Sequence, residues 1–541
     1  MSAEAVTAPS VTARALLPGS RVVAVLALAL PLLTGVPLWA GYLAARPPER
    51  VFLGFRHFIG DELMYASFAR QSADEGRFFM ENRFTAEAHA RRYAPLFPWL
   101  VGWLARLTGQ RIPLVWEETR IVLGVVFLVL VWRLVCGCFA TAEERIEAFA
   151  IVALSGGLGW LAAATAAPDG TIAATWADFW SFSTFGALVA PMWIAACCVW
   201  LLVVLTVTQP SLPSPVRWIV GLVLPPLAWG LHPYTGTLGY ATLALFVALP
   251  LARRAGGHAV PWDEMRVRLR AAAPALASLV VVAAYVVWAQ REAAFAVSSG
   301  RSFAWHPIYP LAVYPIAYGL LLPLGLLGVV WRTGLDPRRA DLLLAWLLAA
   351  FVLSRNPFTS GIKFQYLVHL PLAVFAAAGL TQLRRRWSPA RLLRGRAALL
   401  VGVLLFGHAV FTIADVTRGT AGAPYLYLSD GELRAFAFLD GQPRGVTLCT
   451  AVTGNYIPWL ARQPVVAGHW FLTPAVDEKI EAIRSFFAVG GPLEPKQALL
   501  REAHVRWVYV GPLERALGDL DPRLGLERVY DAGGVAIYRA P

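Results

Sequence analysis

The sequence predicts a polytopic, all-α membrane protein that ends in a small α/β domain. Of its 541 residues, 57% are hydrophobic and only 15% are charged. The apolar residues gather in nearly uncharged runs, several of which reach the roughly 20 residues that a helix needs to cross a bilayer. After about residue 417 these runs stop, and the composition becomes that of a soluble domain.

We expect about eleven transmembrane helices in a domain that covers residues 21–416. A polar cytoplasmic tail, 1–20, precedes this domain, and a C-terminal α/β domain, 417–541, follows it. The first two spans are separated by a long outer loop, 46–119. The predicted spans are 22–45, 120–139, 147–167, 186–208, 216–232, 236–252, 271–290, 309–331, 340–354, 364–381 and 397–416.

Positive charge is distributed unevenly along the chain. The formal net charge is +13, and the arginines concentrate in three loops between predicted spans. If the N-terminus is cytoplasmic, all three loops are cytoplasmic too, as the positive-inside rule requires. The basic charge therefore predicts topology, and we expect no nucleic-acid partner. The three loops contain Arg253, Arg254, Arg266, Arg268 and Arg270; Arg332, Arg338 and Arg339; and Arg384, Arg385, Arg386, Arg391, Arg394 and Arg396.

An odd number of spans puts the outer loop and the C-terminal domain together on the extracytoplasmic side. The abundance of Arg and Ala, with only three lysines, is typical of a GC-rich bacterial genome, so we expect a multi-pass protein of the bacterial plasma (inner) membrane. The C-terminal domain is predicted to contain strands at 446–451, 505–510 and 535–539 and helices at 432–439, 477–487 and 496–503.

The outer loop opens with two adjacent acids, Asp61 and Glu62. They begin a predicted amphipathic helix, 61–75, that lies on the membrane surface, and the helix dipole favours ionised carboxylates in the first turn. A carboxylate at this position suits general-base catalysis on an acceptor hydroxyl, with Asp61 as the base and Glu62 second. The structural alternative is a solvated helix N-terminus.

The same loop ends in basic residues. Arg91, Arg92 and Tyr93 precede a second predicted interfacial helix, 96–107, which begins among prolines and ends before Gly109. A pair of guanidinium groups can hold a phosphate by bidentate hydrogen bonds. We therefore expect these three residues to bind the phosphate of a donor.

Further candidates lie in other outer loops and in one helix break. Asp169 and Asp178 are predicted to orient an acceptor or to serve a divalent metal, although their spacing demands no metal. His232 lies in a predicted break between two spans, and His306 lies in the third outer loop. Arg355 and Lys363 lie in the fourth outer loop, against the positive-inside trend, where they bind an anionic group or extend from span ends to the membrane surface.

The outer loop resembles integral-membrane glycosyltransferases of the GT-C class. The similarity is carried by the acidic pair, by the run Pro-Leu-Phe-Pro-Trp at 95–99, and by Arg120 at the start of the following span. The closer likeness is to the branch of protein O-mannosyltransferases and lipid A aminoarabinose transferases. In that branch the second element is similar to Lys-Pro-Pro-Leu-x-x-Trp. Here the lysine is absent, and Arg91 and Arg92 stand just before the run.

This resemblance implies a polyprenyl-phosphate-linked sugar as donor and inversion at the anomeric carbon. It implies transfer on the outer face, to a hydroxyl of a cell-envelope glycan, lipid or protein, and a place for Arg120 at the donor phosphate. The alternatives are a lipid or glycolipid transporter and a non-catalytic glycolipid-binding membrane protein. Transporters place ionisable groups near the bilayer midplane and show inverted repeats, whereas here the charges cluster in outer loops.

Overall fold

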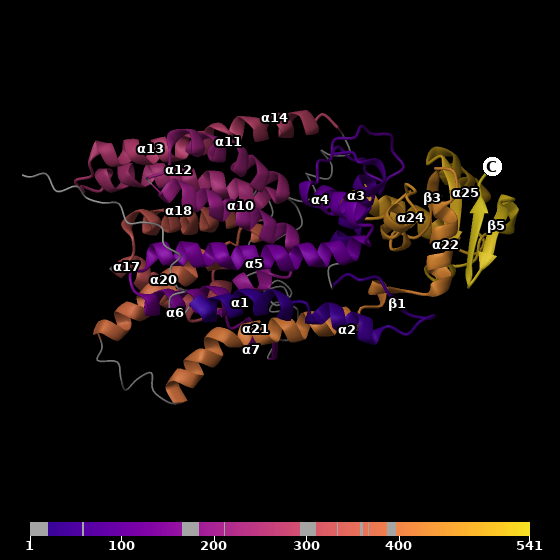
Figure 1. Ribbon diagram of the computed structural model, residues 1–541. Coiled ribbons are helices and arrows are strands. Elements are labelled where there is room, and N and C mark those ends of the chain that lie inside the picture. The colour runs from indigo at the N-terminus through magenta and orange to yellow at the C-terminus, as the bar shows by residue number, and fades with distance from the viewer. Residues whose placement is uncertain are drawn as a thin grey trace, which may run out of the picture.

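A bundle of long helices carries a compact domain at one end (Figure 1). The computed structural model describes residues 20–56, 59–164, 183–209, 211–292, 310–332, 334–356, 361–365, 367–386 and 396–541. The bundle is built from α1 (Ser20–Leu33), α2 (Val36–Ala44), α5 (Ile112–Cys138), α6 (Ala142–Leu154), α7 (Gly159–Ala164), α9 (Thr184–Ala187), α10 (Pro191–Thr208), α11 (Ser214–Leu231), α12 (Pro233–Ala255), α13 (Trp262–Ala277), α14 (Leu279–Ala289), α16 (Val313–Tyr318), α17 (Leu321–Trp331), α18 (Pro337–Ser354), α19 (Ile362–Gln365), α20 (His369–Arg386) and α21 (Arg396–Gly422).

Each of the eleven predicted span ranges contains a helix, but fewer helices have the dimensions of a span. Within the described part of the chain, six helical segments are both long and apolar enough to cross a membrane. Others are shorter or carry charge; α6 has 13 residues and two glutamates in its first turn. Eleven crossings therefore stay a prediction. The six segments are Arg21–Ala44, Ile112–Cys138, Pro191–Thr208, Pro233–Ala255, Trp262–Ala289 and Val401–Gly422.

Small residues let two helices of the bundle pack closely. A side chain on Gly328 of α17 would come within 1.9 Å of the Phe375 carbonyl oxygen in α20, and one on Gly379 would come within 2.1 Å of the Leu324 carbonyl oxygen. Such approaches are typical of membrane helix pairs, because backbone contact replaces the hydrophobic driving force that lipid removes.

Two of the three arginine-rich loops meet at the same end of the bundle. Asp341 of α18 accepts hydrogen bonds from Arg253 in the last turn of α12, from Arg268 within α13 and from Arg332 directly after α17. Figure 1 shows these helix ends opposite the C-terminal domain. The structure thus groups arginines from two of the predicted loops, while the compartment that each end faces stays a prediction.

The outer loop forms two helices where they were predicted. α3 (Ile59–Glu75) ends at Gly76 and α4 (Leu96–Thr108) at Gly109, and both glycines have positive φ angles, of 67° and 69°. The left-handed conformation at these positions favours glycine, which ends each helix. α3 and α4 pack at Gly102, where a side chain would come within 2.0 Å of the Ala69 carbonyl oxygen.

The C-terminal domain contains a four-stranded sheet of order β3-β4-β6-β5. The three predicted strands are confirmed, and a fourth, β5, was missed because its residues are mostly exposed and do not alternate as expected for a strand with one buried face. Its elements are α22 (Asp430–Asp440), β3 (Val446–Leu448), α23 (Ile457–Leu460), α24 (Val476–Phe487), α25 (Leu493–Glu502), β4 (Val505–Val510), α26 (Pro512–Arg515), β5 (Glu527–Ala532) and β6 (Val535–Arg539).

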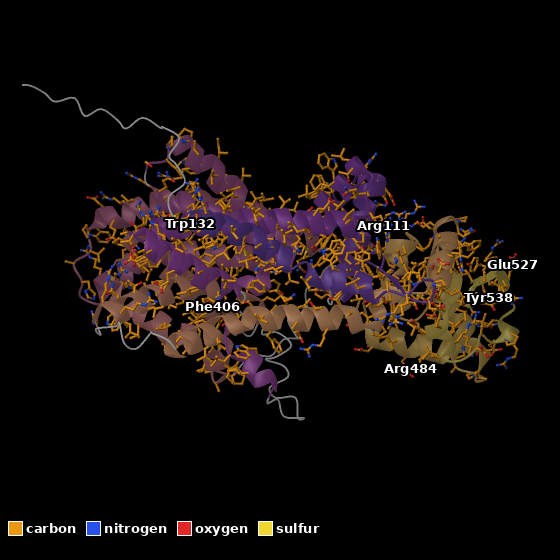
Figure 2. The ribbon with its side chains drawn as sticks, turned by 60° about the horizontal axis from the view of Figure 1, so that its bottom comes forward. Arg111, Trp132, Phe406, Arg484, Glu527 and Tyr538 are labelled. Atoms are coloured by element: carbon orange, nitrogen blue, oxygen red, sulfur yellow. The ribbon has the colours of Figure 1, made fainter. Side chains whose placement is uncertain are left out.

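The outer loop and the C-terminal domain pack against each other. β1 (Val51–Phe52) pairs antiparallel with β2 (Tyr427–Leu428), and Arg444 donates to Glu81 over 2.7 Å. In Figure 2, Arg111 lies near the junction of the two parts, whereas Glu527 and Tyr538 lie at the far end of the domain. Because α21 continues past residue 417 to Gly422, the C-terminal domain begins a few residues later than predicted.

Candidate functional site

Asp61 lies in the first turn of α3, at the junction between the bundle and the C-terminal domain. Its side chain is 53% exposed. The Nε2 atom of His469, a residue of the C-terminal domain, lies 3.2 Å from its Oδ1 atom. The junction thus presents a carboxylate that substrate can reach and that a second domain also contacts.

Glu62, its neighbour, faces the interior. Its side chain accepts a hydrogen bond of 2.8 Å from the backbone N–H of Arg56, and only 8% of the residue is exposed. Burial raises the pKa of Glu62 to about 7, although the nearby charge of Arg56 works in the opposite direction. The two adjacent acids therefore differ in exposure and in hydrogen-bond partner.

A buried ion network continues from Glu62 into the bundle. The guanidinium of Arg56 is hydrogen-bonded to Glu117, and burial lowers the pKa of Arg56 to about 10. Arg120, one turn after Glu117, is completely buried. Its five N–H groups are all taken by protein acceptors, namely both oxygens of the Glu117 carboxylate, the Thr34 hydroxyl, and the carbonyls of Pro31 and Leu188.

This geometry does not favour the predicted role of Arg120 at a donor phosphate. A guanidinium has five N–H donors, and here each already has an acceptor inside the protein. We infer that Arg120 and Arg56 neutralise the charge of Glu117 near the start of α5. Their role is then to stabilise the buried surroundings of Glu62.

Aromatic residues connect Asp61 to the bundle. Tyr65, one turn after Asp61, stacks on Trp116 of α5 with ring centroids 5.9 Å apart. The pKa of the Tyr65 phenol is raised well above its usual range, first by burial and then by the nearby Asp61 and Tyr234. Tyr234 of α12 is thereby placed beside α3.

A lysine and a histidine adjoin Tyr234. The Nζ atom of Lys363 lies 5.2 Å from the Tyr234 ring centroid, within cation–π range. His232 caps α12, since its Nδ1 accepts from the Thr235 backbone N–H at 3.3 Å, and its ring lies 5.6 Å from that of Tyr234. The predicted helix break is confirmed, because α11 ends at Leu231 and α12 begins at Pro233. Lys363 and His232 thus both lie beside Tyr234.

The basic end of the outer loop lies elsewhere. Arg91 donates to Glu75 over 2.7 Å at the last residue of α3, fourteen residues from Asp61, which corresponds to about 21 Å along a helix. Arg92 donates to the Trp288 carbonyl over 2.7 Å. These contacts tie the loop to itself and to α14, so the structure does not bring Arg91 and Arg92 together with Asp61.

Tyr93 has a packing role in the same region. Its residue is 8% exposed, its ring stacks on Phe68 at 5.8 Å, and its backbone pairs with that of Met80. This environment favours a structural function over direct contact with a donor.

Comparison with known proteins identifies the architecture. No protein-family model matches the sequence, and no curated protein is detectably similar to it. Among solved structures, the arabinofuranosyltransferase AftD from Mycobacteria is similar to this protein, with TM-score 0.54 and 19% identity. The aligned region covers 96% of this chain and 40% of AftD. The Archaeoglobus fulgidus oligosaccharyltransferase AglB, solved with an inhibitory peptide and a dolichol-phosphate, is also similar, with TM-score 0.52 and 12% identity. The aligned region covers 95% of this chain and 73% of AglB.

The chain has the GT-C fold. ArnT from Cupriavidus metallidurans, solved with undecaprenyl phosphate, also matches 94% of this chain over 97% of its own, with TM-score 0.48 and 16% identity. At identities of 19% and 12%, the similarity to AftD and AglB establishes the architecture, and the chemistry has to be argued from this chain's own residues.

On this GT-C fold, several predicted site residues cannot be placed. Asp169, Asp178 and His306 lie outside the described residues. Arg355 follows the last residue of α18, and its predicted anion contact stays a prediction. Within the described ranges, no group of three or more His, Cys, Asp or Glu side chains could hold a metal ion.

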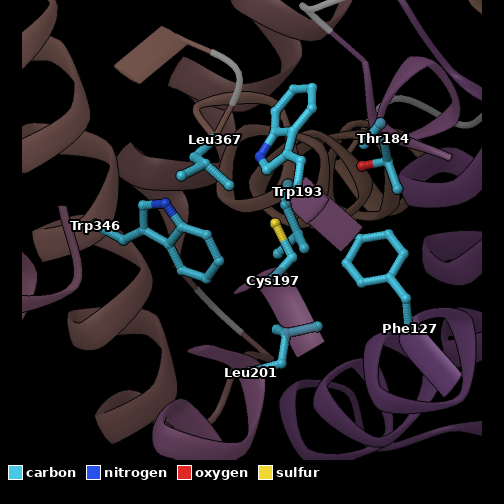
Figure 3. Close-up of a pocket in the computed structure, with 9 residues that line it drawn as sticks. Phe127, Thr184, Trp193, Cys197, Leu201, Trp346 and Leu367 are labelled. Carbon is cyan, nitrogen blue, oxygen red and sulfur yellow. The ribbon is translucent and has the colours of Figure 1, made fainter. Parts of the chain in front are cut away.

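A small apolar pocket lies inside the bundle of the GT-C fold, and the ring of Trp193, which lines it, lies 6.3 Å from the ring of His232. Figure 3 shows Phe127, Trp193, Cys197, Leu201 and Trp346 around it. None of the predicted site residues lines it, and Thr184 contributes its only hydroxyl. The pocket therefore offers no charged group for sugar or phosphate chemistry.

Sequence reasoning missed three residues of this site. His469 is 1% exposed, and the sequence analysis did not link it to Asp61. Arg56 and Glu117 were not singled out either. A glutamate three residues before an arginine at the start of an apolar span was the available signal for a buried ion pair. No signal in the sequence indicated the contact of His469, because its partner lies 408 residues away.

Proposed function

We propose that this protein is a membrane glycosyltransferase. It moves a sugar from a polyprenyl-phosphate-linked donor to an acceptor hydroxyl on the outer face of a bacterial plasma membrane, with inversion at the anomeric carbon. The GT-C fold supports this proposal, since one solved protein of similar architecture is an arabinofuranosyltransferase and another is an oligosaccharyltransferase with a dolichol-phosphate.

The observation that carries the proposal is the contrast between Asp61 and Glu62. A general base must come within hydrogen-bond reach of the hydroxyl it deprotonates. The Asp61 side chain is 53% exposed at the junction of loop, bundle and C-terminal domain, whereas Glu62 is buried against Arg56. We therefore assign the base to Asp61 and a supporting role to Glu62.

Lys363 is our candidate for the phosphate. As the acceptor oxygen forms its bond to the anomeric carbon, the bond from that carbon to the donor oxygen breaks, and its electron pair leaves with the phosphate. The acceptor proton passes to Asp61. A cation beside the departing phosphate stabilises the charge that develops there. Lys363, whose ammonium group lies over the Tyr234 ring, is the proposed cation. It takes the role that the sequence analysis gave to Arg91 and Arg92.

The test is turnover of synthetic donors by the purified protein in nanodiscs. A panel of polyprenyl-phosphate sugars is offered with candidate glycan, lipid and peptide acceptors, and sugar transfer is followed by mass spectrometry. Asp61→Asn is expected to lower kcat by about 10² to 10⁴-fold, the usual contribution of a general base. Lys363→Ala is expected to lower turnover less, and NMR of the product reports the anomeric configuration.

Asp74→Asn is the matched control. Asp74 lies on the same helix and pairs with the partly exposed Arg70 over 2.7 Å, so its loss is expected to leave turnover unchanged. If the wild-type protein consumes no donor, yet binds a polyprenyl lipid equally well with and without the Asp61 carboxylate, the glycolipid-binding or transport alternative replaces the enzyme.

Asp169 and Asp178 are the candidate ligands for a divalent metal. If these aspartates hold a metal, chelation with EDTA lowers turnover and added Mn²⁺ or Mg²⁺ restores it. Full turnover in EDTA would instead leave them the role of orienting the acceptor.

A further inference from the structure

The C-terminal domain brings one histidine to the proposed base. His469 is 1% exposed, and its Nε2 atom lies 3.2 Å from Oδ1 of Asp61. The two residues come from different parts of the molecule. His469 belongs to the segment between α23 and α24 of the C-terminal domain, whereas Asp61 lies in the first turn of α3.

The imidazole is held in position by its surroundings. Its ring centroid lies 6.0 Å from that of Phe84 and 6.4 Å from that of Phe471. The carbonyl of His469 accepts hydrogen bonds from the backbone N–H groups of Leu472 and Thr473, both at 3.0 Å. The Thr473 hydroxyl in turn donates to the Phe84 carbonyl over 2.8 Å. The turn that presents the ring is therefore anchored to the outer loop that carries Asp61.

The hydrogen bonds also define the tautomer. An ionised carboxylate only accepts hydrogen bonds, so the Nε2 atom of His469 must carry the proton that it shares with Asp61. The Nδ1 atom is buried and has no hydrogen-bond partner among the described residues. A proton on Nδ1 would be a buried donor without an acceptor, which is costly.

We propose that His469 is a positioning residue for the catalytic carboxylate, so that the C-terminal domain completes the active site. This inference rests on the proposed function. By donating from Nε2 to Oδ1, His469 holds the Asp61 carboxylate in one orientation toward the acceptor hydroxyl. An Asp61 side chain without this contact samples other rotamers, and the base meets the acceptor less often.

The experiment compares two substitutions of His469 in the full-length protein. His469→Phe keeps an aromatic ring of similar size but removes the N–H, whereas His469→Gln places an amide N–H near the position of Nε2. We expect His469→Phe to lower kcat about tenfold or more, a fraction of the effect of losing the base, with KM for the donor unchanged. His469→Gln is expected to recover most of the loss. A merely structural role would not separate the two variants in this way.

His504→Asn is the matched control. His504 is an exposed histidine of the same domain with φ of 48°, a conformation that asparagine tolerates, and we expect wild-type turnover. Equal thermal stability and gel-filtration behaviour of all variants establish that they fold.

A double substitution tests the link to Asp61 directly. In the Asp61→Asn background, His469→Phe is expected to cause little further loss of residual turnover, because both changes remove the same interaction. Wild-type kcat in His469→Phe, or losses that multiply in the double variant, would overturn the positioning role while leaving the glycosyltransferase intact. A wild-type protein without turnover on any donor would overturn the proposed function and this inference together.

Discussion

Residue-scale burial separates the two acids that open α3. Asp61 and Glu62 are adjacent in the chain, but one side chain points to the junction and the other to a buried arginine. Burial of a carboxyl group disfavours its ionised form, and the single hydrogen bond from the Arg56 backbone does not compensate fully. The two neighbouring acids are therefore expected to respond differently to substitution.

Glu62 should make folding pH-dependent. Its pKa rises from 4.5 when unfolded to about 7 when folded, so its contribution to stability is complete below pH 4.5 and is lost as the pH rises through 7. The loss above pH 7 corresponds to about 3 kcal/mol. We expect Glu62→Gln to reduce the fall in thermal unfolding midpoint between pH 5 and pH 8, measured in detergent. Glu118→Gln, an exposed carboxylate on α5, should leave that fall unchanged; a Glu62→Gln profile that matches the wild type would contradict the prediction.

Arg120 should matter for stability more than for donor binding. Arg120→Lys replaces five N–H donors in a fixed fork with three on a flexible stem, leaving buried acceptors unsatisfied. We expect a lower thermal unfolding midpoint with little change in KM for the donor, whereas Arg111→Lys at the exposed start of α5 should behave as the wild type. A raised KM with unchanged stability would instead support the predicted phosphate contact.

At the scale of elements, one buried carboxylate ties together the basic end of the bundle. Asp341 of α18 holds Arg268 at 2.6 Å and Arg332 at 3.0 Å, and it also pairs with Arg253. Removing one partner from a buried ion group costs about 3 to 5 kcal/mol, because the remaining charges are left uncompensated. We expect Asp341→Asn to lower the unfolding midpoint strongly. Asp263→Asn, whose carboxylate is 87% exposed, should have almost no effect, and equal effects of the two would argue against the cluster.

At the scale of the whole molecule, the charge pattern and the fold together predict orientation. The arginine-rich end lies opposite the C-terminal domain, so the positive-inside rule puts that domain outside the cytoplasm. A cysteine at Val489, which is 81% exposed, should react with a membrane-impermeant maleimide in intact cells. A cysteine at Arg266 should react only after permeabilisation. Both variants also carry Cys136→Ser, since the other four native cysteines are buried. The reverse pattern of labelling would show that the topology is the opposite of the predicted one.

Local patterns in the sequence determined most of the secondary structure. Apolar runs, prolines and glycines act over a few residues, so α3, α4, the break at His232 and the strand Val505–Val510 could all be predicted from their own neighbourhoods. The exposed strand β5 could not, because its residues show no buried face. The resemblance of the outer loop to the GT-C class agrees with the fold that the structure shows.

Only the tertiary structure decided which charges meet. Arg91 and Arg92 looked like partners of Asp61 because they share a loop, but Arg91 binds Glu75, about 21 Å from Asp61 along α3, and Arg92 binds the Trp288 carbonyl of α14. His469 lies 408 residues from Asp61 and yet contacts it, because the C-terminal domain packs on the outer loop. Contacts of this kind depend on packing between distant segments, so the order of residues along the chain supplies the candidates and the fold selects among them.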